Sequence, residues 1–376
     1  MTSALTALND ETKADEAAGW LARKAAEPAT AGAVLLHSPS HVFQAPGGGE
    51  NQLVRTAVEL EALGLPVRPF SPWVDRLENA RLLHLFGMSR EGLELARVAR
   101  CRGVSVVLSP ICWYDPRSLA ALAPSRRRAA FDVVKWAAQR AFAGRFGWRR
   151  ELLGLANAVL PNSKAEARQL VATFGADLEK IHVVPNGVEA RFADAAPELF
   201  REAYGTGEFV LYVGRIESRK NVLGLIKAIR ALETPLVVIG DAPPGSEAYR
   251  KTCRDAGKGF VTWHRAVAHE DPFLASAYAA SRVVALPSWF ETPGLAALEG
   301  ALSGRAVVVT PYGSAREYFG DRVHYARPDH PREVANALAW AWENGPDPTL
   351  ASHVRSNYSW TEVARRTAEV YDDVAR

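Results

Sequence analysis

From residue 32 onward, short apolar runs rich in β-branched residues alternate with longer stretches whose apolar residues recur at helical spacing. This alternation is typical of β-α-β units, because parallel strands of one sheet must be joined by a crossover, usually a helix. In the first half of the chain, strands are predicted at residues 33–37, 67–70, 82–86, 104–108, 158–160 and 181–184. Helices are predicted between them at residues 50–63, 90–101, 126–153 and 163–174. The sequence therefore predicts an α/β fold.

The same pattern restarts after a polar, irregular segment that ends near Gly207. Strands are predicted there at residues 209–213, 236–239, 260–263, 283–286 and 306–310. Helices are predicted at residues 221–232, 246–256, 271–280, 295–303, 331–344 and 360–374. A chain of 376 residues is too long for one ordinary core and suits two α/β domains. We therefore expect two Rossmann-like, doubly wound domains that face a central cleft, where open α/β sheets bind ligands.

The domain boundaries follow from where the pattern starts and stops. We expect an N-terminal extension at residues 1–31, a first domain at 32–190 and a second domain at 191–358. Residues 359–376 are predicted to form a C-terminal helix that packs back toward the first domain.

Composition bounds the class of protein and its compartment. The net charge is only +3, which gives no reason to expect a nucleic-acid partner. Three cysteines without metal-ligand spacing, Cys101, Cys112 and Cys253, fit a reducing cytoplasm. Residues 1–31 lack the features of a secretory signal, and no apolar run approaches the roughly 18 residues of a spanning helix. We expect a cytoplasmic protein, and association with the inner face of the membrane stays open.

Two carboxylates, Glu291 and Glu299, lie eight residues apart in a segment that runs from a strand end into a helix. Backbone N–H groups from Thr292 to Gly294, together with the positive end of the helix dipole, would favour an anion. Glu299 lies among leucines, where a carboxylate needs partners, and a ribose diol offers two hydroxyl donors. The alternative is that both glutamates belong to a helix start and a solvated helix face.

A second group of charges, Arg215 and Lys220, follows the first strand of the second domain. Arg supplies a planar fork for phosphate oxygens and Lys a point charge, and a departing diphosphate requires such neutralisation. A basic loop can also be simply solvated, so this segment alone leaves both interpretations open.

Together the two segments resemble glycosyltransferase family 4, in which a Gly-Arg…Lys-Asn loop and a Glu-x7-Glu segment build a nucleotide-sugar site. The resemblance extends to Gly47-Gly48-Gly49-Glu50, Pro185-Asn186-Gly187-Val188 and Ser359-Trp360, and covers about residues 32–376. It implies the GT-B fold, with the acceptor on the first domain and the donor on the second.

The resemblance also implies roles for individual residues. Arg215 and Lys220 would hold the donor diphosphate and Glu291 would face the donor sugar, which makes these three the candidate catalytic residues. Glu299 would bind the ribose hydroxyls. The remaining candidate substrate-binding residues are Gly48, Gly49, Thr292, Pro293, Gly294, Leu295, His84 and Asn186. Glycine suits the turn because a Cβ would hold the backbone away from the leaving group.

The implied reaction moves a hexosyl unit from a nucleotide-diphosphate sugar to a glycan or lipid-linked acceptor, with retention of anomeric configuration. A cell-surface polysaccharide or a glycolipid would be the product. Such enzymes generally need no bound metal and no cofactor, and the sequence contains no Asp-x-Asp. We therefore expect metal-independent catalysis.

The sequence departs from the family pattern at two points. Many members have a histidine after the strand equivalent to residues 104–108, where this chain has Leu108-Ser109-Pro110. His84 could contribute to the cleft instead, although a histidine among apolar residues is more often part of a core. The usual Glu-Gly-Phe-Gly is replaced by Glu291-Thr292-Pro293-Gly294, which leaves the donor sugar open.

Residues 126–150 form a basic amphipathic stretch with eight Arg or Lys and one Asp, interleaved with aromatic residues. Such a stretch suits an anionic membrane or a diphosphate-linked lipid acceptor. The alternative is a solvated outer face whose aromatic side chains pack on the sheet. Two rival functions also stay open: a non-catalytic module that binds nucleotide sugars or glycans, and an epimerase or phosphorylase of the same architecture.

Overall fold

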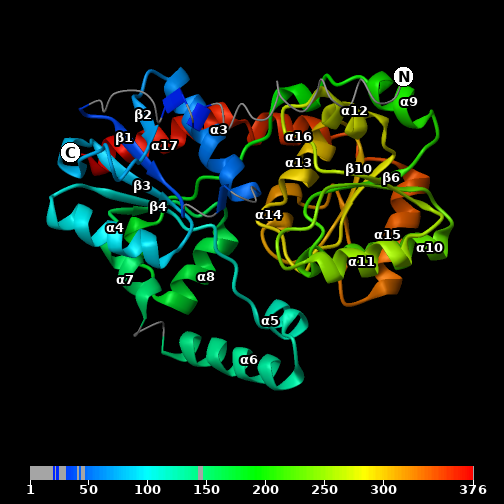
Figure 1. The fold of residues 1–376 in the computed structure, drawn as a ribbon, viewed down its shortest axis with the longest axis horizontal. Coiled ribbons are helices and arrows are strands. Elements are labelled where there is room, and N and C mark those ends of the chain that lie inside the picture. Colours follow the sequence, from blue (N-terminus) through cyan, green and yellow to red (C-terminus); the bar gives the residue numbers. More distant parts are fainter. Residues whose placement is uncertain are drawn as a thin grey trace.

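The computed structural model describes residues 20–21, 23–24, 31–39, 42–43, 47–142 and 147–375. Two parallel sheets, each flanked by helices, form the two lobes seen in Figure 1. This architecture confirms the predicted α/β class. The N-terminal extension predicted at residues 1–31 lies outside the described residues, apart from residues 20–21, 23–24 and 31.

The first sheet has five strands in the order β2-β1-β3-β4-β5. Its strands are β1 (Val34–His37), β2 (Val67–Pro69), β3 (Leu82–Phe86), β4 (Val106–Ser109) and β5 (Ala158–Val159). Side chains alternate between the faces of a strand. Accordingly Val34 and Leu36 belong to a core shared with helix α3 (Gly48–Ala62), whereas Leu35 belongs to a core shared with α4 (Arg90–Cys101).

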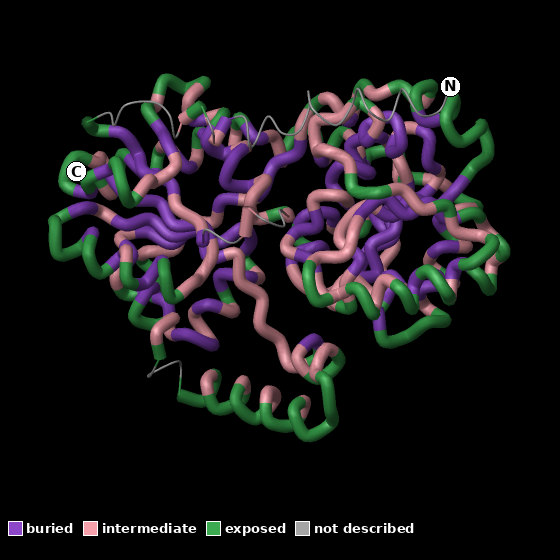
Figure 2. The backbone as a smooth tube through the Cα atoms, viewed as in Figure 1, coloured by how far each residue is buried: buried purple, intermediate pink, exposed green. Residues whose placement is uncertain are grey.

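The other helices of the first domain differ widely in burial. Helices α7 (Trp148–Leu155) and α8 (Lys164–Phe174) pack on the α4 side of the sheet. Helices α5 (Pro116–Leu122) and α6 (Arg126–Ala141) project from this domain (Figure 1). All residues of α6 are described and none of them is buried, as Figure 2 shows.

Two predicted elements of this domain are wrong. The helix predicted at 126–153 is two helices, because α6 ends at Ala141 and α7 begins after Gly147, whose φ of 129° no helix accommodates. The strand predicted at 181–184 is reduced to one bridge between Val159 and Ile181. Pro161, which follows β5, has no N–H and so cannot donate the next hydrogen bond of a ladder between β5 and residues 181–184.

The second sheet has six strands in the order β11-β10-β9-β6-β7-β8. They are β6 (Val210–Val213), β7 (Leu236–Ile239), β8 (Val261–His264), β9 (Val283–Leu286), β10 (Ala306–Val309) and β11 (His324–Tyr325). Around them lie α9 (Glu198–Tyr204), α10 (Val222–Leu232), α11 (Glu247–Ala256), α12 (Pro272–Ala280), α13 (Leu295–Leu302), α14 (Ala315–Phe319), α15 (Pro331–Asn344) and α16 (Leu350–Asn357). Chain order reverses between β6 and β9, the kind of position where doubly wound sheets bind ligands.

The last helix, α17 (Trp360–Val374), returns to the first domain and packs along α3. Trp360, Val363 and Tyr371 belong to the core on that side of the first sheet. The two segments that join the domains touch where Val188 pairs with Ser359. Gly187 permits this approach, since a Cβ there would lie 2.6 Å from the backbone nitrogen of Trp360.

Candidate functional site

The charged residues of the second domain come from the loops that follow β6 and β9, the two strands at the reversal of chain order. Arg215 and Lys220 lie in the first loop and Glu291 in the second. Residues 218–220 form a 3-10 turn that ends at Asn221, a left-handed residue (φ 54°) whose Nδ2 donates to the carbonyl of Pro287 over 3.1 Å. The two loops are therefore fixed to each other.

Lys220 and Glu291 form an ion pair with 2.7 Å between Nζ and Oε1. The same carboxylate oxygen accepts a hydrogen bond of 2.6 Å from the Ser288 hydroxyl. Burial alone would raise the pKa of Glu291, but Lys220 and the nearby Arg219 outweigh it and lower that pKa. Burial also lowers the pKa of Lys220, against the attraction of Glu291. Glu291 is thus held ionised with its partner in place.

The backbone around Glu291 is fixed by β-type contacts with the loop after β10. Its N–H donates to the carbonyl of Tyr312, and its own carbonyl accepts from the N–H of Ser314 over 2.8 Å. Gly313 (φ 97°) lies so close that a Cβ would be 2.0 Å from the Glu291 carbonyl oxygen. Only glycine fits there.

Arg215 is the more accessible of the two candidate phosphate-binding cations, with 39% of its side chain exposed. Its Nη2 lies 3.5 Å from Glu217 Oε1, and the same oxygen pairs with Arg219 at 3.0 Å. Its carbonyl accepts a 2.7 Å hydrogen bond from the hydroxyl of Tyr212. The Arg215 guanidinium can therefore turn to bind an anion, because Glu217 would still be paired with Arg219.

The glycine turn of the first domain reaches these residues across the interdomain boundary. An added Cβ on Gly47 would lie 3.5 Å from Cζ of Arg215, and one on Gly48 would lie 3.7 Å from Leu295. An added Cβ on Gly49 would lie 3.4 Å from the side chain of Ile111. The N-terminus of α3 thus lies directly opposite the N-terminus of α13.

The peptide from Thr292 to Leu295 forms the entry to α13. Gly294 is the N-cap residue with φ 90°, and Leu295 packs against the cores of both domains. The Thr292 carbonyl accepts a hydrogen bond of 3.3 Å from Nδ2 of Asn162 in the first domain. This peptide therefore lies at the junction of the two domains.

Glu299 lies on α13 and is almost fully enclosed, at 5% exposed. Its Oε1 lies 2.7 Å from Nε2 of His269, and its Oε2 accepts a 2.6 Å hydrogen bond from the Tyr278 hydroxyl. The sequence reasoning missed His269 and Tyr278. No motif connects them to Glu299, because they precede it by 30 and 21 residues.

Two other predicted site residues, His84 and Asn186, are buried. His84 is 1% exposed, and its two ring nitrogens lie 2.6 Å from the Tyr371 hydroxyl and 2.9 Å from the Ser109 hydroxyl. Burial lowers its pKa to about 3, so it is a neutral, satisfied core residue and its predicted place on the cleft is wrong. Asn186 is 3% exposed, and its N–H donates to the Tyr318 hydroxyl. Its Oδ1 has no hydrogen-bond partner among the described residues.

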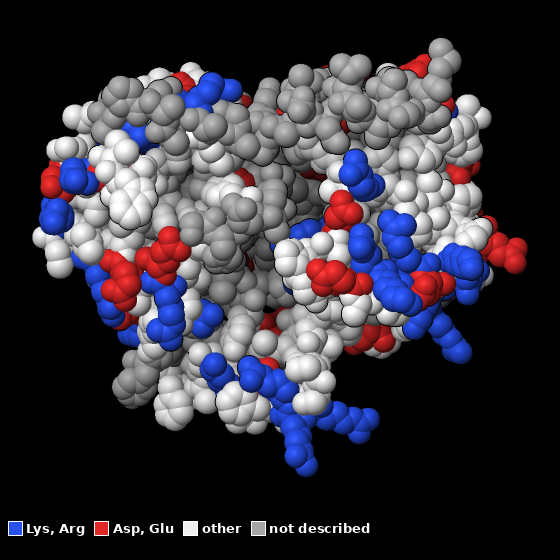
Figure 3. All heavy atoms as spheres, in the orientation of Figure 1, with Lys and Arg blue, Asp and Glu red and all other residues white. Residues whose placement is uncertain are grey.

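Aromatic and cationic side chains connect the segment before and within α5 to the loops that follow β9 and β10. The Trp113 ring stacks on Phe290, the neighbour of Glu291, with centroids 6.4 Å apart. The guanidinium of Arg117 lies 4.6 Å from the ring centroid of Tyr312. Figure 3 shows Lys and Arg gathered where α6 projects, and Phe131 and Val134 on the same helix are more than half exposed.

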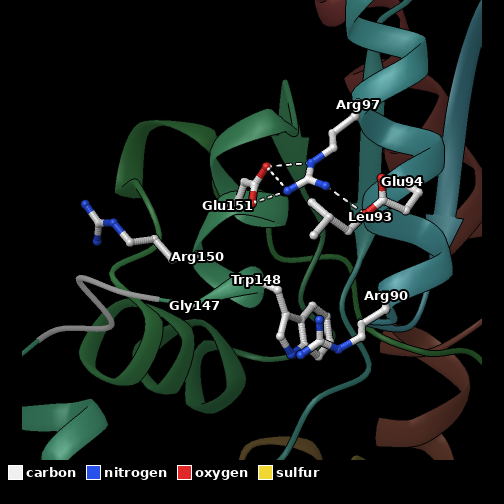
Figure 4. A pocket seen from close by; sticks show the side chains of 8 residues that line it. All are labelled: Arg90, Leu93, Glu94, Arg97, Gly147, Trp148, Arg150 and Glu151. Carbon is white, nitrogen blue, oxygen red and sulfur yellow. Dashed lines mark hydrogen bonds and ion pairs between the residues drawn. The ribbon is translucent and has the colours of Figure 1, made fainter.

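Hollows elsewhere on the molecule do not coincide with these residues. A shallow depression of about 560 Å³ lies between α4 and α7, and the paired Arg97 and Glu151 occupy its wall (Figure 4). A second cavity of about 440 Å³ lies at the carboxyl ends of β1 and β2, with mostly apolar walls and His37 among them.

Within the described ranges, no helix has the length and apolar character to cross a bilayer. The same ranges contain no cluster of three or more His, Cys, Asp or Glu suited to a metal ion.

Comparison with protein families gives two matches. Residues 207–344 match the family described as glycosyl transferases group 1, and residues 135–192 match glycosyltransferase family 4. The chain is 31% identical over 253 residues to D-inositol 3-phosphate glycosyltransferase of Xylanimonas cellulosilytica, which covers 61% of this chain and 60% of that protein. The protein of the same name from Kineococcus radiotolerans is 30% identical over 262 residues, with the same coverage. The chain thus matches about 60% of the length of these relatives.

Solved structures show the same fold at lower identity. Sucrose-phosphate synthase from Thermosynechococcus elongatus superposes with a TM-score of 0.70 at 18% identity, covering 91% of this chain and 98% of that one. HepE of Anabaena, in complex with UDP and glucose, superposes with a TM-score of 0.66 at 19% identity, covering 91% and 100%. Family matches, relatives and fold agree: residues 135–192 and 207–344 are similar to family 4 and group 1 glycosyltransferases, and the chain has the GT-B fold.

Proposed function

We propose that this chain transfers a hexosyl unit from a nucleoside-diphosphate sugar, bound on the second domain, to an acceptor that approaches from the first. The observation that carries this proposal is the meeting of Arg215, Lys220 and Glu291 at the reversal of strand order, directly opposite the glycine turn. Two cations and two helix N-termini at one place suit a diphosphate. HepE, a structural neighbour, was solved with UDP and glucose, which supports a uridine donor as the first candidate.

The proposed roles of the three residues follow from their charges. Arg215 and Lys220 neutralise the diphosphate as it leaves, and Glu291 accepts hydrogen bonds from donor-sugar hydroxyls. Lys220 then exchanges part of its contact with Glu291 for a phosphate oxygen. As the bond between the anomeric carbon and the diphosphate breaks, the acceptor oxygen bonds to the same face of that carbon. Its proton passes to an oxygen of the departing diphosphate, so configuration is retained without a metal ion. Positioning and charge stabilisation supply the rate.

The acceptor class has two candidates. The projecting basic helix α6, with its exposed Phe131 and Val134, suits a lipid-linked acceptor at an anionic membrane, in polysaccharide or glycolipid synthesis. The matched relatives are named for inositol 3-phosphate, which favours a small phosphorylated polyol as the second candidate. The cavity at the ends of β1 and β2 is large enough for part of either acceptor.

A thermal-shift screen tests the donor site. The purified chain is heated with UDP, GDP, ADP and their common sugar conjugates, each with and without EDTA. A ligand that binds only the folded state raises the melting temperature by mass action. We expect one nucleotide to do so, with no effect of EDTA. Loss of the shift in EDTA would contradict metal independence, and no shift with any ligand would contradict the donor site.

Slow hydrolysis of the donor separates an enzyme from a binding module. We expect the sugar conjugate that gives the largest shift to release free nucleoside diphosphate and sugar over hours, at a rate that Lys220→Ala abolishes. Binding without any turnover would favour the non-catalytic module, and conversion of the conjugate into an epimer would favour an epimerase.

A further inference from the structure

The carboxylate of Glu299 is held from two sides before any ligand arrives. His269 Nε2 contacts Oε1 at 2.7 Å, and the Tyr278 hydroxyl donates to Oε2 at 2.6 Å. Both partners come from the loop and helix that precede β9, so the carboxylate is fixed by elements other than its own helix. An ionised carboxylate has about four lone-pair directions, and these two contacts use only two of them.

His269 is itself fixed at its other ring nitrogen. Its Nδ1 lies 3.0 Å from Glu189 Oε2, in the segment that joins the domains. Glu189 is paired in turn with Arg55 of α3 at 3.1 Å and with Arg191 at 3.3 Å. Because Arg55 lies two turns along α3 from the glycine turn, the series of contacts runs from the first domain to Glu299.

The charge of His269 agrees with this arrangement. Burial alone would lower its pKa, but the carboxylates of Glu299 and Glu189 outweigh burial and raise that pKa to about 9. The imidazolium therefore donates from both nitrogens at neutral pH. Burial alone would raise the pKa of Glu189, but His269, Arg55 and Arg191 outweigh burial and lower that pKa to about 2.

We infer that His269 and Tyr278 are positioning residues for ribose recognition. They hold the Glu299 carboxylate so that one free lone pair on each oxygen faces the ribose diol of the donor nucleotide. This inference rests on the proposed function, and it assigns discrimination between ribose and deoxyribose to a set of residues that no motif marks. A carboxylate free to rotate would recognise the diol less well, because orienting it would oppose binding.

The test compares each nucleoside diphosphate with its 2′-deoxy form. Isothermal titration gives the dissociation constants of UDP, GDP and ADP and of the three 2′-deoxy analogues. The proteins are wild type, His269→Ala, His269→Gln and Tyr278→Phe. His324→Ala serves as the matched control, because it removes a half-buried histidine at the outer edge strand of the same domain.

We expect wild type to prefer the ribose form of its nucleotide by about tenfold or more, the scale of one charge-assisted hydrogen bond. His269→Ala should reduce this preference to less than about threefold, with a smaller effect on the 2′-deoxy form, whose ribose lacks one of the contacts. His269→Gln restores one donor and should recover part of the preference. His324→Ala should leave it unchanged.

The outcomes separate this inference from the proposed function. If wild type prefers ribose and the His269 and Tyr278 variants keep the full preference, the positioning role is overturned while the donor site stands. If wild type binds none of the nucleotides, both fall together. Tyr278→Phe removes a single oxygen from a buried ring, so it tests the same role even if His269→Ala fails to fold. A loss of affinity equal for both forms would indicate only structural damage and would also overturn the inference.

Discussion

Breaking the Lys220–Glu291 pair should destabilise the second domain in the absence of any ligand. The pair is short, at 2.7 Å, and the two side chains are only 15% and 4% exposed. Removing one partner of a buried ion pair costs about 3–5 kcal/mol, because the other charge stays desolvated. Glu291 is the more buried of the two residues. Lys220→Met therefore leaves the less hydrated charge without its partner and should lower the free energy of unfolding by about 4 kcal/mol. Glu291→Gln leaves Lys220 close to solvent and should cost about 2–3 kcal/mol.

A double-mutant cycle measures the coupling. The double variant Lys220→Met/Glu291→Gln removes both charges, so its cost should fall short of the sum of the single variants by about 2–3 kcal/mol. In a domain of this size about 1 kcal/mol lowers the melting temperature by roughly 2–4 °C, so Lys220→Met should lower it by about 8–16 °C. Differential scanning calorimetry of the full chain gives these values. The reasoning would be refuted if the losses of stability of the two single variants added up to that of the double variant. It would also be refuted if the single variants had the melting temperature of wild type.

Three further predictions concern transfer, pH and the projecting helix. Glu299→Ala and Lys220→Ala should each slow sugar transfer at least about tenfold, the effect of losing about 1.4 kcal/mol in the transition state, and near-wild-type rates in both would sink the site assignment. The pKa of His269 is raised to about 9 from 6.5, so its stabilisation is complete below pH 6.5 and disappears as pH rises through 9. Melting temperature should therefore fall between these values by the equivalent of up to about 3 kcal/mol, and His269→Gln should flatten that fall. The exposed cations Arg127 and Lys135 should each add about 1 kcal/mol to binding of anionic vesicles, so replacing both with Gln should weaken cosedimentation about 30-fold, and equal, negligible binding with and without anionic lipid would exclude membrane contact.

The parallel sheets were predictable because their strands are short, continuous apolar runs bounded by turns. The strand at Val283–Leu286 and the helix at Leu295–Leu302 lie where apolar periodicity placed them. Periodicity failed where a single backbone position decided the outcome. Gly147, with a φ of 129°, cannot lie inside a helix, so α7 begins after it, and the proline at 161 cannot donate to residues 181–184, which pair with β5 through a single bridge.

The candidate site was only partly accessible to sequence reasoning, for a different reason. Arg215, Lys220, Glu291 and Glu299 lie in local segments whose spacing carries chemical meaning. His269 has no such segment, because its two carboxylate partners lie 80 residues before it and 30 after it. For His84 the error was a false site residue rather than a missed one. Its hydrogen-bond partner Tyr371 is 287 residues away, so the sequence did not reveal that the histidine is satisfied inside the core.

The return of α17 to the first domain sets the order in which the chain can finish folding during translation. Residues of the second core run continuously from Val188 to Val354, so that core can close as soon as this segment has left the ribosome. The first sheet needs Trp360 and Tyr371 to cover Leu82 and Phe86. At about 5–20 residues per second, the first domain exists for roughly 10–40 s before α17 is complete, with that face covered in part by α3. The domain that is synthesised first is therefore the last to complete its core.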